Sequence, residues 1–194
     1  MRLLVIFGPP SVGKMTVGRA VTRLGDFRMF HNHAVLEPLL EVFAYGTPPF
    51  MRLLGEFRRR VISEAAGSGT NLLLTFVWAL ELEDDAREVN DFIRPYIEAG
   101  AHVSFVELYA NLETRLKRNR TEFRLAEKRS KRDVNWSDDN VRQLEQHVMN
   151  TGSNEGADWT PGERLLSRHR YLRLDNTKLS ADETASQIVA WLDG

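Results

Sequence analysis

The feature that most constrains the fold is a glycine-rich loop between a buried strand and an amphipathic helix. Residues 2–7 (RLLVIF) form an apolar run, which is typical of a strand covered on both faces. The pattern G-x-x-x-x-G-K follows from Gly8 to Lys14, and apolar residues then recur at helical spacing from Val17 to Leu24. Glycines let backbone N–H groups converge on phosphate oxygens at the positive end of the helix. This order of elements predicts a phosphate-binding loop.

We expect this loop to hold the phosphates of a nucleotide, with Lys14 reaching the β- and γ-phosphates and acting in catalysis. The loop residues predicted to contact the nucleotide are Gly8, Pro9, Pro10, Ser11, Val12, Gly13, Lys14, Met15 and Thr16. Asn176 is a further candidate nucleotide contact. Residues 176–178 (NTK) do not match the Asn-Lys-x-Asp pattern that reads guanine in GTPases, so a GTPase is not expected.

The position after Lys14 departs from the usual pattern, and the departure concerns the metal. A Ser or Thr hydroxyl normally coordinates Mg²⁺ there, but this chain has Met15, with Thr16 one place further on. One residue turns a helix by about 100°, so Thr16 is a displaced candidate ligand rather than a replacement. The apolar run 71–78 has no acid before Glu81 that could support the metal. We therefore expect Mg²⁺ to be held mainly through the phosphates of the nucleotide.

Strand and helix patterns alternate along the rest of the chain. Further strands are predicted at 27–30, 71–78, 102–109 and 170–174, with helical patterns between them. This alternation predicts an α/β fold with three layers, αβα, in which a five-stranded parallel sheet presents ligands at the carboxyl ends of its strands. The chain is expected to form a single domain, residues 1–194.

The sequence also predicts local roles for three further side chains. Phe57 is assigned to the apolar stripe of a helix that begins near Phe50, and Ser137 is the expected N-cap of a helix that runs to about Val148. Glu107, inside the fourth strand, either faces the phosphate site or is a buried carboxylate paired with an arginine.

Composition limits the cellular setting and the partners. The chain has no cysteine, which excludes disulfides, thiolate metal sites and cysteine nucleophiles. A formal net charge of −1 argues against nucleic-acid binding over the whole surface. No apolar run approaches the roughly 18–20 residues needed to cross a bilayer, so we expect a soluble, cytoplasmic protein.

The motifs together resemble the P-loop small-molecule and nucleoside-monophosphate kinases, the group of shikimate, gluconate and adenylate kinases. The resemblance rests on Gly8–Thr16, on the His-Asn-His sequence of residues 31–33 and on residues 130–133 (SKRD), and the order of elements extends it over most of the chain. These last motifs are similar to a bacterial branch described only as ATP-binding or kinase-like. The resemblance implies a P-loop NTPase fold with a five-stranded parallel sheet, ATP as phosphoryl donor and a mobile helical lid. It implies no particular acceptor.

Residues 113–132 contain nine basic and three acidic side chains, a net charge of +6. Guanidinium groups stabilise the charge of a transferred phosphoryl group, so this segment is interpreted as part of a lid that spans about residues 118–162. By resemblance to the arginine pair of this kinase group, Arg120 would contact the nucleotide and Arg124 the transferred phosphate, as a catalytic residue. The alternatives are a solvated charged helix face or a nucleic-acid patch, although only Phe123 and Trp136 supply nearby aromatic rings.

The resemblance to this kinase group implies that the acceptor lies where the second and third strands end. His31, Asn32 and His33 fall there; His31 is a candidate general base and Asn32 could hold a hydroxyl. Either histidine could instead be a turn residue bonded to backbone, and a metal site would need a third ligand. Trp78 and Arg58 complete the predicted substrate-binding set, with Arg58 contacting a polar or anionic small molecule.

The sequence thus leaves three functional hypotheses. The first is a kinase that transfers the γ-phosphoryl group of ATP to a hydroxyl or phosphate of a small molecule. The second is an ATP-binding sensor or interaction module with little turnover, which Met15 and the missing metal-supporting acid favour. The third, a nucleic-acid-linked ATPase, depends only on the basic segment. The oligomeric expectation is a monomer or a homodimer.

Overall fold

The computed structural model describes residues 1–121, 134–152 and 158–194, and its centre is a five-stranded parallel sheet. The strands are β1 (Arg2–Phe7), β2 (Arg28–His31), β3 (Leu72–Phe76), β4 (His102–Tyr109) and β5 (Arg170–Asp175), and they lie in the order β2-β3-β1-β4-β5. Every pairing is parallel. The carboxyl ends of all five strands therefore face one edge of the molecule, as the sequence analysis predicted.

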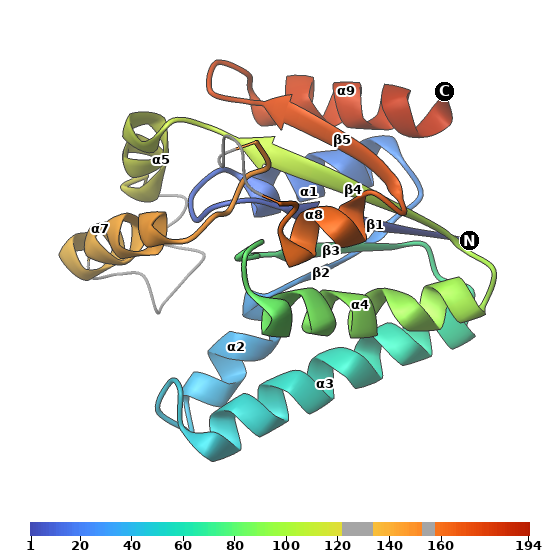
Figure 1. The fold of residues 1–194 in the computed structure, drawn as a ribbon, viewed down its shortest axis with the longest axis horizontal. Helices are drawn as coiled ribbons and strands as arrows, with labels where there is room; N and C mark the ends of the chain where they lie inside the picture. The colour runs from blue at the N-terminus through green and yellow to red at the C-terminus, as the bar shows by residue number, and fades with distance from the viewer. Residues whose placement is uncertain (122–133, 153–157) are drawn as a thin grey trace.

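Helices cover both faces of the sheet and also extend beyond its carboxyl edge (Figure 1). One face carries α1 (Lys14–Leu24) and α9 (Ala181–Asp193). The other face carries α3 (Pro48–Gly67), α4 (Glu83–Glu98) and α8 (Pro161–Leu166). Three helices and one 3₁₀ turn lie toward the carboxyl edge: α2 (His33–Leu40), α5 (Leu112–Asn119), α7 (Val134–Gln143) and η2 (Leu144–Gln146). This arrangement confirms the three-layer α/β fold.

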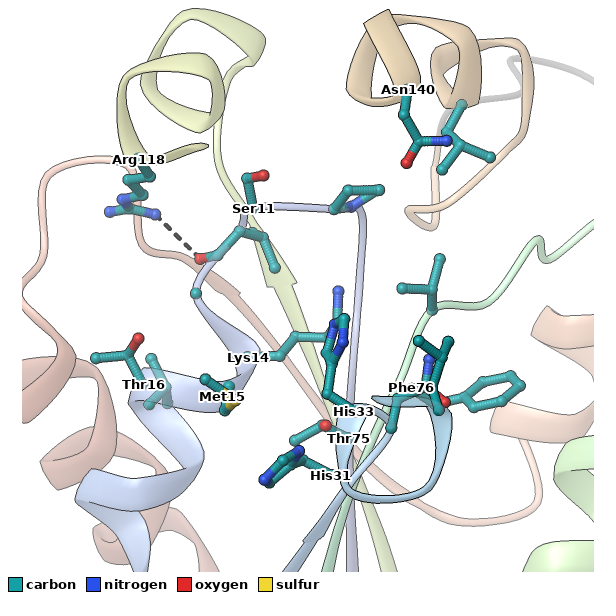
Figure 2. A pocket seen from close by; sticks show the side chains of 18 of the residues that line it. Ser11, Lys14, Met15, Thr16, His31, His33, Thr75, Phe76, Arg118 and Asn140 are labelled. Atoms are coloured by element: carbon teal, nitrogen blue, oxygen red, sulfur yellow. Dashed lines mark hydrogen bonds between the residues drawn. The ribbon is translucent and has the colours of Figure 1, made fainter. Parts of the chain in front are cut away.

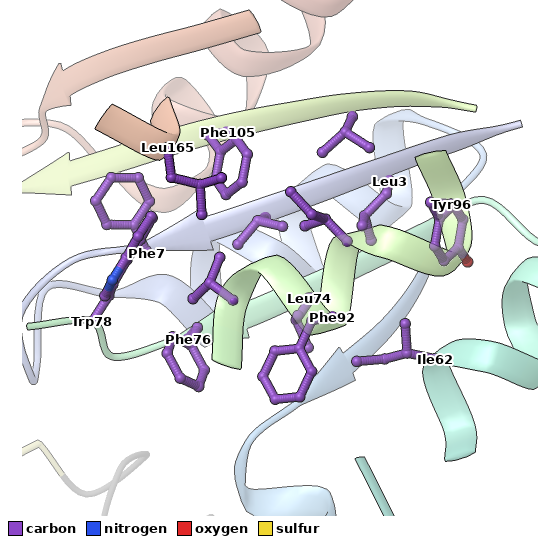
Figure 3. Close-up of a cluster of buried hydrophobic side chains, with 14 of the residues drawn as sticks. Leu3, Phe7, Ile62, Leu74, Phe76, Trp78, Phe92, Tyr96, Phe105 and Leu165 are labelled. Atoms are coloured by element: carbon purple, nitrogen blue, oxygen red, sulfur yellow. The ribbon is translucent and has the colours of Figure 1, made fainter. Parts of the chain in front are cut away.

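The core lies on both faces of β1, because successive side chains of a strand point in opposite directions. Leu3, Val5 and Phe7 pack under α3, α4 and α8, whereas Leu4 and Ile6 pack under α1 and α9. All five are at most 1% exposed, which explains why the strand reads as an unbroken apolar run rather than an alternating one. Figure 3 shows the larger of these two layers, in which aromatic rings from β1, β3, α4 and β4 meet.

Two local predictions from the sequence are wrong. Phe57 is 54% exposed, and the buried row of α3 instead runs through Phe50, Leu54, Arg58 and Ile62 at a spacing of four residues. The helix is rotated so that a guanidinium lies in the row assigned to apolar side chains. Ser137 is not an N-cap either, because α7 begins at Val134.

Glu107 takes the second of the two roles left open for it. Its side chain is fully buried, and one carboxylate oxygen lies 3.1 Å from Nε of Arg173. Asn150 Nδ2 and Thr151 Oγ1 each donate a hydrogen bond of 2.8 Å to the same carboxylate, and Tyr171 donates another. Both oxygens of the carboxylate are occupied by these partners. Glu107 is therefore not a ligand in the phosphate site.

No helix within the described ranges is long and apolar enough to cross a membrane.

Candidate nucleotide and acceptor site

The glycine-rich loop curves around the N-terminus of α1 at the carboxyl end of β1. Three residues of the loop have positive φ angles, Gly8 at 137°, Ser11 at 64° and Gly13 at 106°, and Gly13 immediately precedes the first residue of α1. The ammonium of Lys14 donates hydrogen bonds of 2.7 and 2.8 Å to the carbonyl oxygens of Gly8 and Pro9. These bonds hold the positive charge at the centre of the loop, beside the positive end of the helix.

A cavity of about 970 Å³ opens from this loop along the carboxyl edge of the sheet. Figure 2 shows side chains of the loop, the end of β2, the end of β3 and α7 around it. Its lining includes the following residues predicted from the sequence: Pro10, Ser11, Val12, Gly13, Lys14, Met15, Thr16, His31, Asn32, His33, Arg58 and Asn176. Segments far apart in sequence therefore contribute to one cavity, as the predicted site requires.

Arg118, on α5, and Asn176, directly after β5, hold the glycine-rich loop in place through hydrogen bonds. Asn176 Nδ2 and Arg118 Nη1 both donate to the carbonyl of Val12, at 2.9 and 3.0 Å, and Arg118 Nη2 donates to the backbone carbonyl of Asn176 at 2.7 Å. Burial lowers the pKa of the Arg118 guanidinium. Arg118 also lines the cavity, although the sequence analysis counted it only as one charge of the basic segment.

A buried polar network joins the loop to α5 and α7. Ser11 Oγ and Ser137 Oγ both donate to Asn119 Oδ1, at 3.0 and 3.1 Å, and Asn119 Nδ2 donates to Asp138 at 2.6 Å. Asn119 is fully buried. Arg120 Nε and Nη2 both bind Asp138 Oδ2 at 2.7 Å. Burial opposes ionisation of Asp138, but these donors outweigh it and lower the pKa of the carboxyl group.

Of the predicted arginine pair, the structure describes Arg120. Arg120 ends α5 as its C-cap and binds Asp138, and it is not among the residues that line the cavity. Arg124 lies outside the described residues. Arg115, another base of the segment, is 4% exposed and pairs with Glu145 at 2.6 Å. Arg120 thus joins α5 to α7 and Arg115 joins α5 to η2, whereas Arg118 lines the cavity.

At its other end the cavity is walled by α2, α3 and α4. Arg58 is 9% exposed there; its guanidinium donates to Asn32 Oδ1 and lies 3.4 Å from the carboxylate of Glu88. His33 Nδ1 lies 3.1 Å from the carboxylate of Glu37, one turn further along α2. Asp85 and Glu88, both on α4, also line the cavity. These two acids were not predicted from the sequence. Their only local signal is the i, i+3 spacing near the start of a helix, which places both side chains on one face of that helix.

Trp78 does not line the cavity. Its ring is fully buried in the core, 5.2 Å from the ring centre of Phe7 and 6.0 Å from that of Phe105. It lies two residues beyond the end of β3, where the chain turns back into the core between sheet and α8 rather than toward the ligand side. The predicted substrate contact at this position is wrong.

Replacing Trp78 by phenylalanine should lower the free energy of unfolding by about 1–2 kcal/mol, because the smaller ring leaves unfilled volume in the core. No hydrogen bond is lost, since Nε1 has no partner among the described residues. Urea unfolding would measure the change, and nucleotide affinity should remain that of the wild type. A large loss of ligand binding without loss of stability would instead restore Trp78 to the site.

Few side chains in the described part of the chain could bind Mg²⁺ directly. The described residues contain no group of three or more His, Asp or Glu side chains placed to hold a metal ion. Met15 stands at the position of the usual hydroxyl ligand, and Thr16, the displaced candidate, lines the cavity from an exposed position. A thioether is a poor ligand for Mg²⁺, which prefers oxygen.

Comparison with solved structures identifies the architecture. A sugar kinase from Janibacter sp. superposes with a TM-score of 0.58 at 13% identity, over 100% of this chain and 95% of that one. A shikimate kinase from Acinetobacter baumannii, in complex with shikimate, superposes with a TM-score of 0.56 at 15% identity, over 98% of this chain and 92% of that one. The chain has the fold of the P-loop kinases. At these identities the likeness shows the fold alone.

The Mycobacterium tuberculosis APS kinase, solved with AMPPNP and APS, has the same P-loop kinase fold, with a TM-score of 0.54 at 17% identity over 100% of this chain and 98% of that one. No protein-family model and no curated protein sequence matches the chain. The neighbours are kinases of different acceptors, so the acceptor has to be argued from the residues of this cavity.

Proposed function

We propose that this protein is an ATP-dependent kinase of a small hydroxylated molecule. The observation that carries the proposal is the single cavity of about 970 Å³ that runs from the glycine-rich loop to the wall formed by α2, α3 and α4. Small-molecule sites typically occupy about 300–1,000 Å³, so this volume suits a nucleotide and a small acceptor together. The kinase neighbours support the same reaction class.

In the proposed reaction the γ-phosphate of ATP lies against the backbone N–H groups of the loop and the ammonium of Lys14. An oxygen of the acceptor forms a bond to the γ-phosphorus, while the bond between that phosphorus and the β–γ bridging oxygen breaks. ADP leaves with the electron pair. The transition state of such a transfer is loose, so positioning and positive charge matter more than a strong base. His31, at the end of β2, would accept the hydroxyl proton.

Mg²⁺ is assigned no protein ligand in this proposal beyond the candidate Thr16, because the donor set does not fit a protein-held metal. Segment 118–162 is proposed to act as the lid, with Arg124 supplying charge to the transferred phosphate when the site closes. The network from Ser11 through Asn119 to α7 would link this segment to the loop. The enzyme is proposed to act in the cytoplasm, as a monomer or a homodimer.

One alternative has a specific observation in its favour. Met15 in place of a hydroxyl, together with the missing acidic metal ligand, suits a module that binds ATP with little turnover. Such a sensor would bind ATP equally well with and without Mg²⁺ and would phosphorylate nothing.

The test has two stages. Calorimetric titration with ATP, with and without Mg²⁺, measures binding; an ADP-release screen over small hydroxylated metabolites then measures transfer. We expect binding and at least one acceptor that raises ADP release well above the rate of ATP hydrolysis alone. Absence of ATP binding contradicts both the kinase and the sensor, whereas binding without transfer to any acceptor favours the sensor.

A further inference from the structure

The wall of the cavity opposite the glycine-rich loop, here called the acceptor wall, combines apolar and acidic side chains. Its apolar members come from α2, the loop after it and α3: Leu36, Leu40, Tyr45, Met51 and Leu54. Its charged members are Arg58, Asp85 and Glu88. An acceptor bound here needs an apolar face as well as polar groups, and the charges decide which polar groups suit it.

The positive charge of the acceptor wall is already compensated. Arg58 is 9% exposed, and its two terminal nitrogens are used by Glu88, at 3.4 Å, and by Asn32. Burial lowers the pKa of its guanidinium, which Glu88 partly counteracts. An anionic acceptor would have to displace Glu88 or lie beside it. The guanidinium is therefore a positioning group for Asn32 and Glu88 rather than an open anion site.

The negative charges, in contrast, are under-compensated. Asp85 and Glu88 stand three residues apart, on one face of α4. Asp85 accepts a hydrogen bond of 2.9 Å from the backbone N–H of Ala79 but forms no ion pair with any described residue. The nearby Glu81 is itself paired with His147 at 2.7 Å. On the acceptor wall, two carboxylates thus face one guanidinium, that of Arg58.

Burial raises the pKa of Asp85 and of Glu88, because both carboxylates lose hydration without gaining full compensation. A cation brought between them would restore that compensation. The apolar members of the acceptor wall would cover the carbon skeleton that carries the cation.

We propose that the acceptor is a hydroxylated amine, such as an amino alcohol or an amino sugar, whose ammonium binds Asp85 and Glu88. This inference rests on the proposed kinase function and replaces its open choice of polar or anionic acceptor with a cationic one. The hydroxyl of such a molecule would point toward the glycine-rich loop and receive the phosphoryl group.

The experiment uses matched triplets of acceptors that share a carbon skeleton and differ in one charge, for example glucosamine, glucose and glucuronate. Binding of each member to the ADP-bound full chain is measured by calorimetry, and transfer from ATP by ADP release. The amine should bind about tenfold or more tightly than the neutral and anionic members, the scale expected for one partly buried ion pair.

The decisive variant is Glu88→Gln. It removes half of the ammonium site and also releases Arg58, so affinity for the amine should fall about tenfold while affinity for the carboxylate member rises. Asp85→Asn should weaken amine binding without the rise for the carboxylate, because no guanidinium is released. Glu98→Gln is the matched control: this glutamate lies on the same helix with its side chain 70% exposed, it pairs with Arg94 at 3.8 Å, and it does not line the cavity.

The outcomes separate this inference from the proposed function. If the carboxylate member binds best, or if no amine binds the ADP-bound chain, the inference is overturned while ATP binding and transfer can still stand. If Glu88→Gln leaves the preference unchanged in a protein whose thermal unfolding is normal, the inference is also overturned. Loss of ATP binding in the wild-type chain would instead overturn the proposed function.

Discussion

Lys14→Ala should remove measurable ATP binding and phosphoryl transfer while leaving the fold intact. The ammonium of Lys14 is the only described lysine charge at the cavity, and in the proposed complex it bonds oxygens of two phosphates. A hydrogen bond to a charged group contributes about 1.5–3 kcal/mol. Loss of two such bonds weakens binding by about 100-fold or more. Calorimetric titration with ATP measures the binding, and circular dichroism checks that the fold is retained.

Lys117→Ala is the matched control. Its side chain is 74% exposed on α5, where it pairs with Glu113 at 2.7 Å, and it does not line the cavity. A surface ion pair of this kind contributes about 0–1 kcal/mol, so ATP binding should remain at the wild-type level. Persistence of ATP binding in Lys14→Ala would refute the assignment of residues 8–16 as the phosphate loop.

Gly8→Ala should destabilise the fold by about 3 kcal/mol or more, and it should weaken nucleotide binding in whatever protein remains folded. Gly8 has φ = +137°, a region that side chains rarely adopt, and an added Cβ would lie 2.3 Å from the carbonyl oxygen of Leu108. That carbonyl belongs to β4, next to β1 in the centre of the sheet, so it cannot move away without breaking strand pairing. Urea unfolding, followed by calorimetry with ATP, measures both effects.

Gly69→Ala measures the cost of the positive φ angle without the steric clash that Gly8→Ala also introduces. Gly69 also has a positive φ, +72°, but nothing lies within 4 Å of an added Cβ. The expected cost is therefore the left-handed conformation alone, about 1–2 kcal/mol. Equal destabilisation by the two substitutions would show that the contact with Leu108 carries no energy and that only the φ angle matters.

Several residues were placed correctly from sequence because their signals are local. The Ser-x-x-Glu pattern of Ser180 and Glu183 is a local capping-box signal, and it begins α9 with both reciprocal hydrogen bonds present. The three central strands, β1, β3 and β4, were recognised because a buried parallel strand requires a short continuous apolar run. His31 to His33 reach the cavity because they follow a strand whose carboxyl end lies at the ligand edge of every parallel sheet.

Other residues were misplaced because their position depends on packing between distant segments. The rotation of α3 about its axis is decided by α2 and α4, and it buries Arg58 instead of Phe57. Trp78 lies near the carboxyl end of a strand, as His31 does, yet its side chain packs in the core between Phe7 and Phe105. Nothing in the neighbouring sequence distinguishes these two outcomes.

The sequence by itself determined the parallel α/β architecture and the position of the glycine-rich loop, because periodicity and glycine spacing act over a few neighbouring residues. Only the tertiary structure decided what the charges do. In the folded chain Glu107 pairs with Arg173, and Arg120 pairs with Asp138. Asp85 and Glu88 line the cavity beside Arg58, whose positive charge is compensated by Glu88. The physical reason is that the free energy of a charge depends on its burial and its partners, and both are supplied by segments far away along the chain.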